Sequence, residues 1–362
     1  MKILVTGGAG FIGSNLIDHF LEKGHEVVCL DDLSTGFEHN ISHHFDNLRF
    51  KFIKGDIRDI ETCHAAVKGC DYVSHQAALG SVPRSIENPA NTNSVNITGF
   101  LNMLIASRDA KVKRFVYAGS SSTYGDSKKL PKIEEEIGKP LSPYAVTKYV
   151  NELYADVFAK TYGMQCIGLR YFNVFGKRQN PNSAYAAVIP LWVKKFLNHE
   201  SPVINGDGSY SRDFTYIDNV IQANQKALFA TDEQILDGQK EYYNLELDEH
   251  KYLLSSSSES PGLQLVLRYG AYYFSEIFNI AYGGNTNLIK LFYSLRDNLA
   301  RHDAAIGTIE PVFGAVRAGD VPHSQASIIK AQILLGYNPD CDANEGFKRV
   351  SEWYYKNLRE SE

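Results

Sequence analysis

The amino-acid sequence predicts an α/β protein, in which a doubly wound parallel sheet is followed by a smaller C-terminal α/β lobe. Through the first half of the chain, short runs rich in β-branched residues alternate with segments of helical periodicity. The short runs are apolar throughout, as strands covered by helices on both faces must be. The alternation ends near Gly176, where polar loops and isolated helices begin. This change indicates a second unit that closes a cleft at the carboxyl ends of the strands.

The expected elements of the first unit follow a simple order. The apolar runs predict strands at residues 2–7, 26–32, 49–56, 72–78, 114–121 and 166–176. Helical periodicity predicts helices at residues 11–24, 95–110 and 142–158. We expect residues 1–173 to form this unit, with segments near 214–230 and 277–283 returning to it. Residues 174–362 would then form mainly the second lobe.

The segment near 241–275 departs from this pattern because it combines a serine run with a tyrosine-rich apolar stretch. Loops of this length are uncommon in compact domains. We expect a surface excursion with its own hairpin or helix, and a lid or a subunit contact is the alternative. Both EYYN, from Glu241, and EIFN, from Glu276, resemble the start of the next strand.

Composition narrows the class of protein. A chain of 362 residues can bury a core without disulfides, and its five cysteines show no paired-ligand spacing, which favours a reducing cytoplasm. The first apolar run is soon broken by glycines and no later run reaches the length of a membrane span, so we expect neither a signal peptide nor a membrane anchor. The net charge of −5, with both signs interspersed, argues against a nucleic-acid partner.

A glycine pattern follows the first expected strand and opens the first helix, with Gly7, Gly8, Gly10 and Gly13. Glycines in this context let the backbone approach a pyrophosphate, which the free N–H groups of the helix can bind. Asp31 ends the second strand, where a carboxylate binds the adenosine ribose and repels the extra phosphate of NADP. Together these features predict a Rossmann-type fold with NAD as cofactor. Asp56, at the next strand end, fits an adenine contact.

A second motif points to proton transfer. Tyr144 and Lys148 lie four residues apart on an expected helix and therefore share one face. The fifth strand ends in GSSSTYG, which places Ser120, Ser121 and Ser122 at the same edge of the sheet. Lowering the tyrosine pKa from about 10 toward about 7 requires roughly 4 kcal/mol. An ammonium about 4 Å away supplies roughly that amount at an effective dielectric near 20. We therefore expect Tyr144 to take a proton from a substrate alcohol while hydride passes to NAD.

At this point the chain resembles the extended short-chain dehydrogenase/reductase superfamily, and within it the nucleotide-sugar 4-epimerases. The resemblance covers nearly the whole length and rests on motifs that occur in order: TGGAGFIG, DDLSTG, GDIRD, HQAALGSVPRS, SSSTYG, SPYAVTKYVNE, LRYFNVFGKRQNPN, INGDGSYSRDFTYIDNV, FNIAYGG and VRAGDVPHS. The pair HQAALGSVPRS and YFNVFGKRQ is most similar to the bacterial UDP-N-acetylglucosamine 4-epimerases of surface-polysaccharide synthesis. The resemblance implies NAD-dependent inversion at C4 of a UDP-hexose through a transient 4-keto sugar.

Related reactions are distinguished by one position. The 4,6-dehydratases and UDP-glucuronate decarboxylases of this superfamily carry a glutamate two residues before the tyrosine of the strand-five motif, and this chain has Ser122 before Tyr124. Three alternatives stay open: a UDP-glucose/galactose 4-epimerase, a UDP-glucuronate 4-epimerase, and a catalytically silent NAD-binding sensor or scaffold.

The resemblance also implies site residues. The cofactor would contact Gly7, Gly10, Phe11, Ile12, Gly13, Asp31, Asp32, Ser34, Thr35, Gly36, Asp56, Ile57, Gln76, Ala77, Ala78, Tyr144, Lys148 and Tyr171. The UDP-sugar would contact Gly80, Ser81, Ser120, Ser121, Ser122, Tyr144, Asn173, Gln179, Ala187, Val188, Val203, Asn205, Arg212, Arg317, Asp320 and Ser324. In these sets Arg212 and Arg317 neutralise the diphosphate and Asp320 holds the uridine ribose. Ser324 occupies the family's sugar-size gate, where a small residue admits an acetamido group.

The remaining features have simpler interpretations. His43 and His44 have no third ligand nearby in the sequence, so we expect an exposed polar loop and no metal site. The acidic run Glu134 to Glu136 is expected to be a solvated loop. Aromatic residues from Tyr149 to Tyr162 at helical spacing predict core packing or a helix-bundle dimer face. The resemblance favours a cytoplasmic homodimer.

Overall fold

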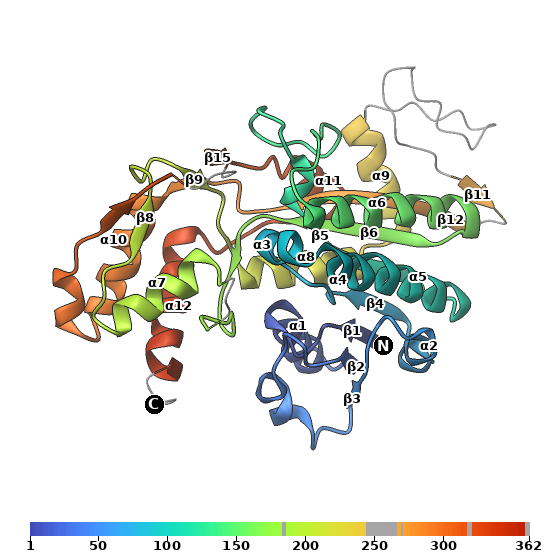
Figure 1. Cartoon of the computed structure of the whole chain (residues 1–362). Coiled ribbons are helices and arrows are strands. Elements are labelled where there is room, and N and C mark those ends of the chain that lie inside the picture. The colour runs from blue at the N-terminus through green and yellow to red at the C-terminus, as the bar shows by residue number, and fades with distance from the viewer. Residues whose placement is uncertain (183–185, 244–265, 269–270, 317–320, 359–362) are drawn as a thin grey trace.

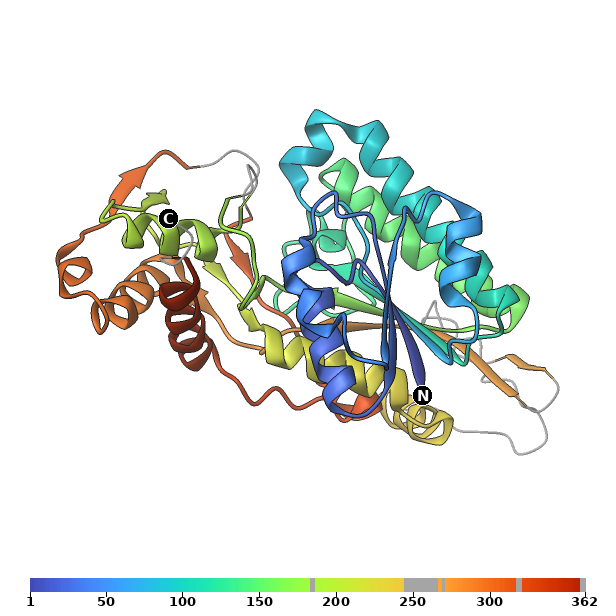
Figure 2. The ribbon, with the colours of Figure 1, turned by 90° about the horizontal axis from the view of Figure 1, so that it is seen from below.

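The computed structural model describes the chain except for residues 183–185, 244–265, 269–270, 317–320 and 359–362. The described residues form a large sheet with helices on both faces and, beside it, a smaller lobe (Figure 1). The view from below shows the lobe, which holds the C-terminal helix, next to the end of the sheet (Figure 2). Among the described helices, none has both the length and the apolar character that a membrane span requires.

The large sheet has the strand order β11-β12-β6-β5-β4-β1-β2-β3. Its strands are β1 (Lys2–Thr6), β2 (Glu26–Asp31), β3 (Phe50–Lys54), β4 (Tyr72–His75), β5 (Arg114–Ser120), β6 (Gln165–Tyr171), β11 (Val266–Arg268) and β12 (Ala271–Ile280). All neighbours from β12 to β3 pair in parallel, and β11 adds to the edge in the antiparallel direction. The predicted doubly wound parallel sheet is confirmed.

Helices cover both faces of this sheet. One face carries α1 (Phe11–Glu22) and α8 (Ile217–Phe229). The other carries α2 (Ile60–Val67), α3 (Val82–Glu87), α4 (Pro89–Asn93), the π-helical turn η3 (Ser94–Gly99), α5 (Phe100–Asp109) and α6 (Pro143–Tyr162). Side chains of β1 alternate between the two cores: Ile3 and Val5 pack in the core that contains Ile17, whereas Leu4 packs in the core that contains Phe100 and Phe115. A strand buried on both faces is apolar at every position, which is why the sequence showed no alternation.

The edge of the sheet resolves the choice between EYYN and EIFN. The EIFN stretch lies in β12, where Glu276 is the register partner of Ile167 in β6. The first three residues of the EYYN stretch instead end α9 (Asp232–Tyr243), a helix that packs on α11 (Ile329–Leu335). Most of the unusual segment near 241–275 lies outside the described residues.

The smaller lobe is built from helices and short strands. Its helices are α7 (Val188–Leu197), α10 (Leu288–Ala300), η5 (Ala304–Thr308) and α12 (Ala343–Leu358). Its strand groups are β8 (Val203–Asn205) with β14 (Val312–Gly314), and β9 (Ser211–Arg212) between β13 (Thr286–Asn287) and β15 (His323–Ser324). Strands β7 (Val174–Phe175) and β10 (Thr215–Tyr216) pair where the chain passes between the two units. Phe292 packs edge-on against Trp192 and Phe196, which joins α10 to α7.

The expectation of a solvated loop at Glu134 to Glu136 is wrong for its first residue. Glu134 is 7% exposed, and its Oε1 accepts a 2.7 Å hydrogen bond from the backbone N–H of Asn279 in β12. Its carbonyl oxygen accepts from Arg170, which also forms a two-pronged ion pair with Glu152. The sequence shows only a run of acidic residues. In the fold, Glu134 connects the loop before α6 to strands β6 and β12 of the sheet.

Candidate active site

A cavity of about 340 Å³ opens at the carboxyl ends of β1, β2, β3 and β4. Fourteen of the residues predicted to bind the cofactor line it: Gly7, Gly10, Phe11, Ile12, Gly13, Asp31, Asp32, Ser34, Thr35, Asp56, Ile57, Gln76, Ala77 and Ala78. These side chains and backbone groups come from four loops that are far apart in the sequence. The parallel sheet brings the loops together because all its strands end at one edge.

The glycine turn shapes the floor of this cavity. Gly7 has φ of +64°, and a Cβ there would lie 2.7 Å from the backbone nitrogen of Ala77, so both conformation and space require glycine. A Cβ on Gly13 would lie 2.2 Å from the Gly7 carbonyl oxygen. Helix α1 starts at Phe11 after Gly10, which offers no side-chain cap. The first N–H groups of the helix therefore remain available to an anion.

Acidic side chains stand at the ends of β2 and β3. The Asp31 carboxylate accepts hydrogen bonds from the backbone N–H groups of Ala9, at 2.9 Å, and Leu33, at 2.8 Å. Burial raises the pKa of Asp31, and these two hydrogen bonds oppose the rise. Asp56 pairs with Arg58, which holds the pKa of the Asp56 carboxyl below its usual value. Asp31 is thus held rigidly at the cavity wall by the backbone of the glycine turn and of its own loop.

Helix α6 carries the candidate phenol and ammonium. It begins at Pro143, and the Ser142 hydroxyl caps it by accepting a 3.1 Å hydrogen bond from the Ala145 N–H. Tyr144 lies in the first turn and Lys148 one turn later, so both face the carboxyl end of β5. The expected helix and the shared face of the two side chains agree with the structure.

A short hydrogen-bond chain connects this helix to β5. The Ser120 hydroxyl hydrogen-bonds the side chain of Tyr144 and accepts from the Ser122 hydroxyl at 2.9 Å. Lys148 Nζ donates to the Ala118 carbonyl oxygen at 2.8 Å and lies 6.0 Å from the centroid of the Tyr144 ring. Ser121 starts the 3₁₀ turn η4 (Ser121–Tyr124) beside them. The three serines, the tyrosine and the lysine expected from sequence therefore gather at one strand end.

Burial governs the protonation of this group. It raises the pKa of Tyr144, which the hydrogen bond from Ser120 only partly offsets. Burial lowers the pKa of Lys148 to about 8, although Glu152 acts in the opposite direction. The Lys148 ammonium is directed at a backbone carbonyl and the phenol is desolvated, so lowering of the Tyr144 pKa by Lys148 together with an oxidised nicotinamide stays a prediction.

Comparison with known proteins identifies the family of the chain. A model of the NAD dependent epimerase/dehydratase family matches residues 3–244. The chain therefore belongs to the NAD-dependent epimerase/dehydratase family. It is 34% identical over 359 residues to a putative UDP-glucose 4-epimerase from Methanocaldococcus jannaschii, with 99% of each chain covered.

Solved structures of family members are similar over the whole chain. The UDP-N-acetylglucosamine 4-epimerase from Methanobrevibacter ruminantium M1, in complex with UDP-N-acetylmuramic acid, has a TM-score of 0.80 and 32% identity, with 98% of each chain covered. The UDP-glucose 4-epimerase from Thermotoga maritima, with UDP-glucose, has a TM-score of 0.79 and 33% identity, with 99% of this chain and 100% of that chain covered.

The cofactor of this epimerase/dehydratase is NAD. The residues of the cavity fit it: the uncapped start of α1 suits a pyrophosphate, the close packing of Gly7 brings the backbone to it, and the Asp31 carboxylate suits a ribose diol. When bound, NAD supplies the hydride acceptor and donor of the reaction.

The smaller lobe of the epimerase/dehydratase presents several of the residues expected at the substrate. Ser324 in β15 and Arg212 in β9 are register partners in one small sheet. Arg212 Nη1 donates to the carbonyl oxygens of Ser211, at 2.9 Å, and Pro322, at 3.2 Å. The gate position and one predicted phosphate ligand therefore lie side by side. Arg317 and Asp320 lie outside the described residues.

Other expected substrate residues occupy the connections between the units. Asn173 has φ of +38°, and its Nδ2 donates to the Asp213 carbonyl oxygen at 3.1 Å. Gln179 Nε2 donates to the Val174 carbonyl oxygen, also at 3.1 Å. The rest are placed as follows: Gly80 at the cavity, Ser81 as N-cap of α3, Ala187 and Val188 at the start of α7, and Val203 and Asn205 in β8.

The cavity also includes residues that sequence reasoning did not name as cofactor residues: Leu30, Gly55, Leu79, Gly80, Arg84 and Val95. Leu30 and Gly55 directly precede Asp31 and Asp56 in the sequence. The predicted positions of Asp31 and Asp56 could therefore have identified Leu30 and Gly55 as cavity residues. Four expected residues do not line the cavity: Tyr144 and Lys148, which lie on α6 at the end of β5, and Gly36 and Tyr171. Gly36 packs against Ala9, where a Cβ would lie 2.8 Å from its carbonyl carbon, and Tyr171 donates its buried hydroxyl to Gln76.

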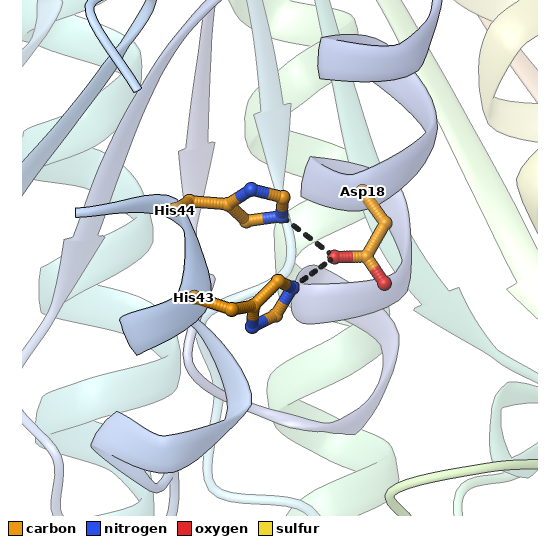
Figure 3. Close-up of side chains that lie close together, drawn as sticks. All are labelled: Asp18, His43 and His44. Atoms are coloured by element: carbon orange, nitrogen blue, oxygen red, sulfur yellow. Dashed lines mark hydrogen bonds and ion pairs between the residues drawn. The ribbon is translucent and has the colours of Figure 1, made fainter. Parts of the chain in front are cut away.

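The interpretation of His43 and His44 also needs correction. They were expected to lie in an exposed loop without a third ligand nearby, yet Asp18 of α1 is within hydrogen-bond distance of both imidazoles (Figure 3). The His44 side chain is only 16% exposed. Asp18 is distant in the sequence, so the pattern of neighbouring residues could not show this contact.

Proposed function

We propose that the enzyme inverts C4 of a UDP-hexose and that its substrate pair is UDP-N-acetylglucosamine and UDP-N-acetylgalactosamine. The observation that carries the proposal is the hydroxyl–phenol–ammonium group at the end of β5, with Ser122 in place of a carboxylate. Oxidation and re-reduction at one carbon need a single proton carrier, whereas elimination of water needs an additional acid and base. The relatives that are 4-epimerases support this choice.

The chain's own residues would handle the proton. Tyr144 would take the proton of the sugar 4-hydroxyl and return it when the 4-keto sugar is reduced from its other face. Because burial holds the Tyr144 pKa high, the phenol needs nearby positive charge, which Lys148 and an oxidised nicotinamide would both provide. Ser120 would keep the phenol oriented through their hydrogen bond.

The diphosphate and uridine would bind in the smaller lobe. Arg212 would neutralise one phosphate, and Arg317 and Asp320 are proposed for the other phosphate and the ribose. The small side chain of Ser324 beside Arg212 favours a pocket wide enough for an acetamido group. A UDP-glucose/galactose pair is the second candidate, because two relatives that cover nearly the whole chain are named UDP-glucose 4-epimerases.

Proton NMR of the sugar C4 position tests this function. Purified protein is incubated with UDP-N-acetylglucosamine, with and without added NAD, and appearance of UDP-N-acetylgalactosamine is the expected result. UDP-glucose and UDP-glucuronate are run in parallel, and a faster reaction with either one would replace the proposed substrate. Lack of reaction with all three, by protein that binds NAD, would favour a sensor or scaffold. The same assay on a Tyr144→Phe variant distinguishes turnover by this site from a contaminating epimerase.

A further inference from the structure

A cluster of three side chains outside the cofactor cavity joins two elements of the large unit. His43 and His44 belong to η2 (Ser42–His44), which follows η1 (Glu38–Asn40) in the segment after β2, and Asp18 belongs to α1 (Figure 3). The two Nε2 atoms lie 3.1 and 2.8 Å from the same carboxylate oxygen, Oδ1 of Asp18. One potential ligand atom from each residue lies within 4.8 Å of the others.

The spacing of these atoms suits a metal ion. Metal–nitrogen and metal–oxygen bonds in zinc sites are about 2.0–2.2 Å long, so neighbouring ligand atoms lie roughly 2.8–3.1 Å apart in octahedral geometry and roughly 3.3–3.6 Å apart in tetrahedral geometry. The imidazole-to-carboxylate distances of 3.1 and 2.8 Å in the cluster match the octahedral range. An ion could therefore replace the two protons between Asp18 and the imidazoles with small side-chain movements. The His43 side chain is 45% exposed, which leaves a path for the ion and for water ligands.

The charges around Asp18 restrict the kind of ion. Arg178 lies 2.8 Å and Lys177 3.8 Å from Oδ2, so one carboxylate oxygen is directed at cations and Oδ1 at the histidines. Ca²⁺ and Mg²⁺ need several oxygen ligands, whereas this cluster offers one carboxylate, one oxygen of which is already directed at Arg178 and Lys177. Two imidazole nitrogens instead favour ions such as Zn²⁺, Co²⁺ and Ni²⁺.

We propose that Asp18, His43 and His44 form a binding site for a divalent transition-metal ion. The ion links α1 to the segment between β2 and β3. That segment begins with Asp32, Ser34 and Thr35 at the cofactor cavity. Metal binding therefore stabilises the folded protein by fixing η2 against α1, without contacting the proposed catalytic residues.

The experiment uses tag-free, full-length protein freed of metal with a chelator. Calorimetric titration with Zn²⁺ should give one strong site per chain, and bound Co²⁺ should give a visible absorption band of imidazole and carboxylate coordination. Zn²⁺ should also raise the melting temperature, and Mg²⁺ should do neither. Absence of a Zn²⁺ site, or equal binding of Mg²⁺, would overturn the proposal.

Matched variants locate the site. His43→Asn removes a half-exposed imidazole with little risk to folding, and should weaken Zn²⁺ binding by at least about tenfold and abolish the shift in melting temperature. His64→Asn and His199→Asn are controls, because each of these histidines pairs with a single carboxylate, Asp109 or Asp303. Both controls should bind Zn²⁺ like the natural protein. If His43→Asn binds as well as they do, the ion is held elsewhere and the assignment is wrong.

Discussion

Tyr144 is the side chain whose chemistry is easiest to isolate. Tyr144→Phe removes one hydroxyl and keeps the ring on α6, so we expect NAD binding and folding to persist. Loss of a positioned acid–base group costs about 10²–10⁴-fold in rate. We therefore expect epimerisation, followed by NMR, to fall by that factor. Bound NAD, measured by absorbance after denaturation, is the control, and undiminished turnover would show that another group carries the proton.

Ser324 tests the sugar pocket. Ser324→Tyr places a ring next to Arg212 on the neighbouring strand and should fill the space for an acetamido group. We expect the kcat/KM for UDP-N-acetylglucosamine to fall at least about tenfold, whereas that for UDP-glucose, which has no such group, should change little. Ser327→Tyr, a nearby substitution outside the predicted pocket, is the matched control. Equal loss with both sugars would mean that the substitution disturbs the lobe rather than the gate.

Site residues that belong to a sequence motif could be predicted. Residues that reach a site only through a tertiary contact could not be predicted. The glycine turn and Asp31 could be predicted because their spacing within one β–α–β segment determines their positions. Arg84 could not, because it reaches the cavity from α3, whose sequence carries no cofactor pattern. Asp18 meets His43 and His44 only because α1 packs beside the segment after β2.

At the scale of elements, the Glu134 carboxyl connects the loop before α6 to the sheet, and this carboxyl can gain or lose a proton. Burial raises the pKa of Glu134 to about 7, although Lys330 and the Asn279 N–H act against the rise. With an unfolded pKa near its ordinary 4.5, the folded state binds more protons between pH 4.5 and about 7. Its contribution to stability is therefore present at low pH and is lost as the pH rises through this window.

Glu134→Gln tests this connection. The amide oxygen can still accept from the Asn279 N–H, but no charge has to be buried. Denaturant unfolding across pH 5–8 should show that the variant gains stability relative to the natural protein as the pH rises. Glu136→Gln, in an ion pair with exposed Lys129, is the control and should leave the profile unchanged. A profile for Glu134→Gln that parallels the natural one would contradict the buried titration.

The elements themselves were largely predictable because apolar runs report burial on both faces of a parallel sheet. Strands β1 to β5 and helices α1 and α5 lie within the expected segments, whereas β6 begins one residue before its expected segment and α6 ends four residues after its own. Helix α2 was not expected, since its eight residues are too few to show a clear periodicity. The choice of β12 over the EYYN stretch depended on pairing with β6, which is a long-range contact.

At the scale of the whole molecule, α6 leaves an apolar row on the surface of the large unit. Val146, Leu153 and Val157 are 46%, 49% and 51% exposed, and their spacing places them along one side of the helix. Phe158, one of the aromatic residues of α6, is instead buried in the core. Exposed apolar rows of this kind are typical of interfaces. We expect this row to be the contact between two copies of the chain.

Leu153→Glu places a charge in the centre of that row and should convert a dimer into a monomer, measured by sedimentation velocity over a range of concentrations. Leu191→Glu is the matched control, because this leucine is 42% exposed on α7 of the other lobe and should not affect association. Both variants keep helix-forming residues at exposed sites, so circular dichroism should be unchanged. A natural protein that sediments as a monomer, or a Leu153→Glu variant that stays dimeric, would exclude α6 as the interface. If dissociation also reduces turnover, the reason must be indirect, since the row points away from Lys148, which lies buried against β5 on the opposite side of the helix.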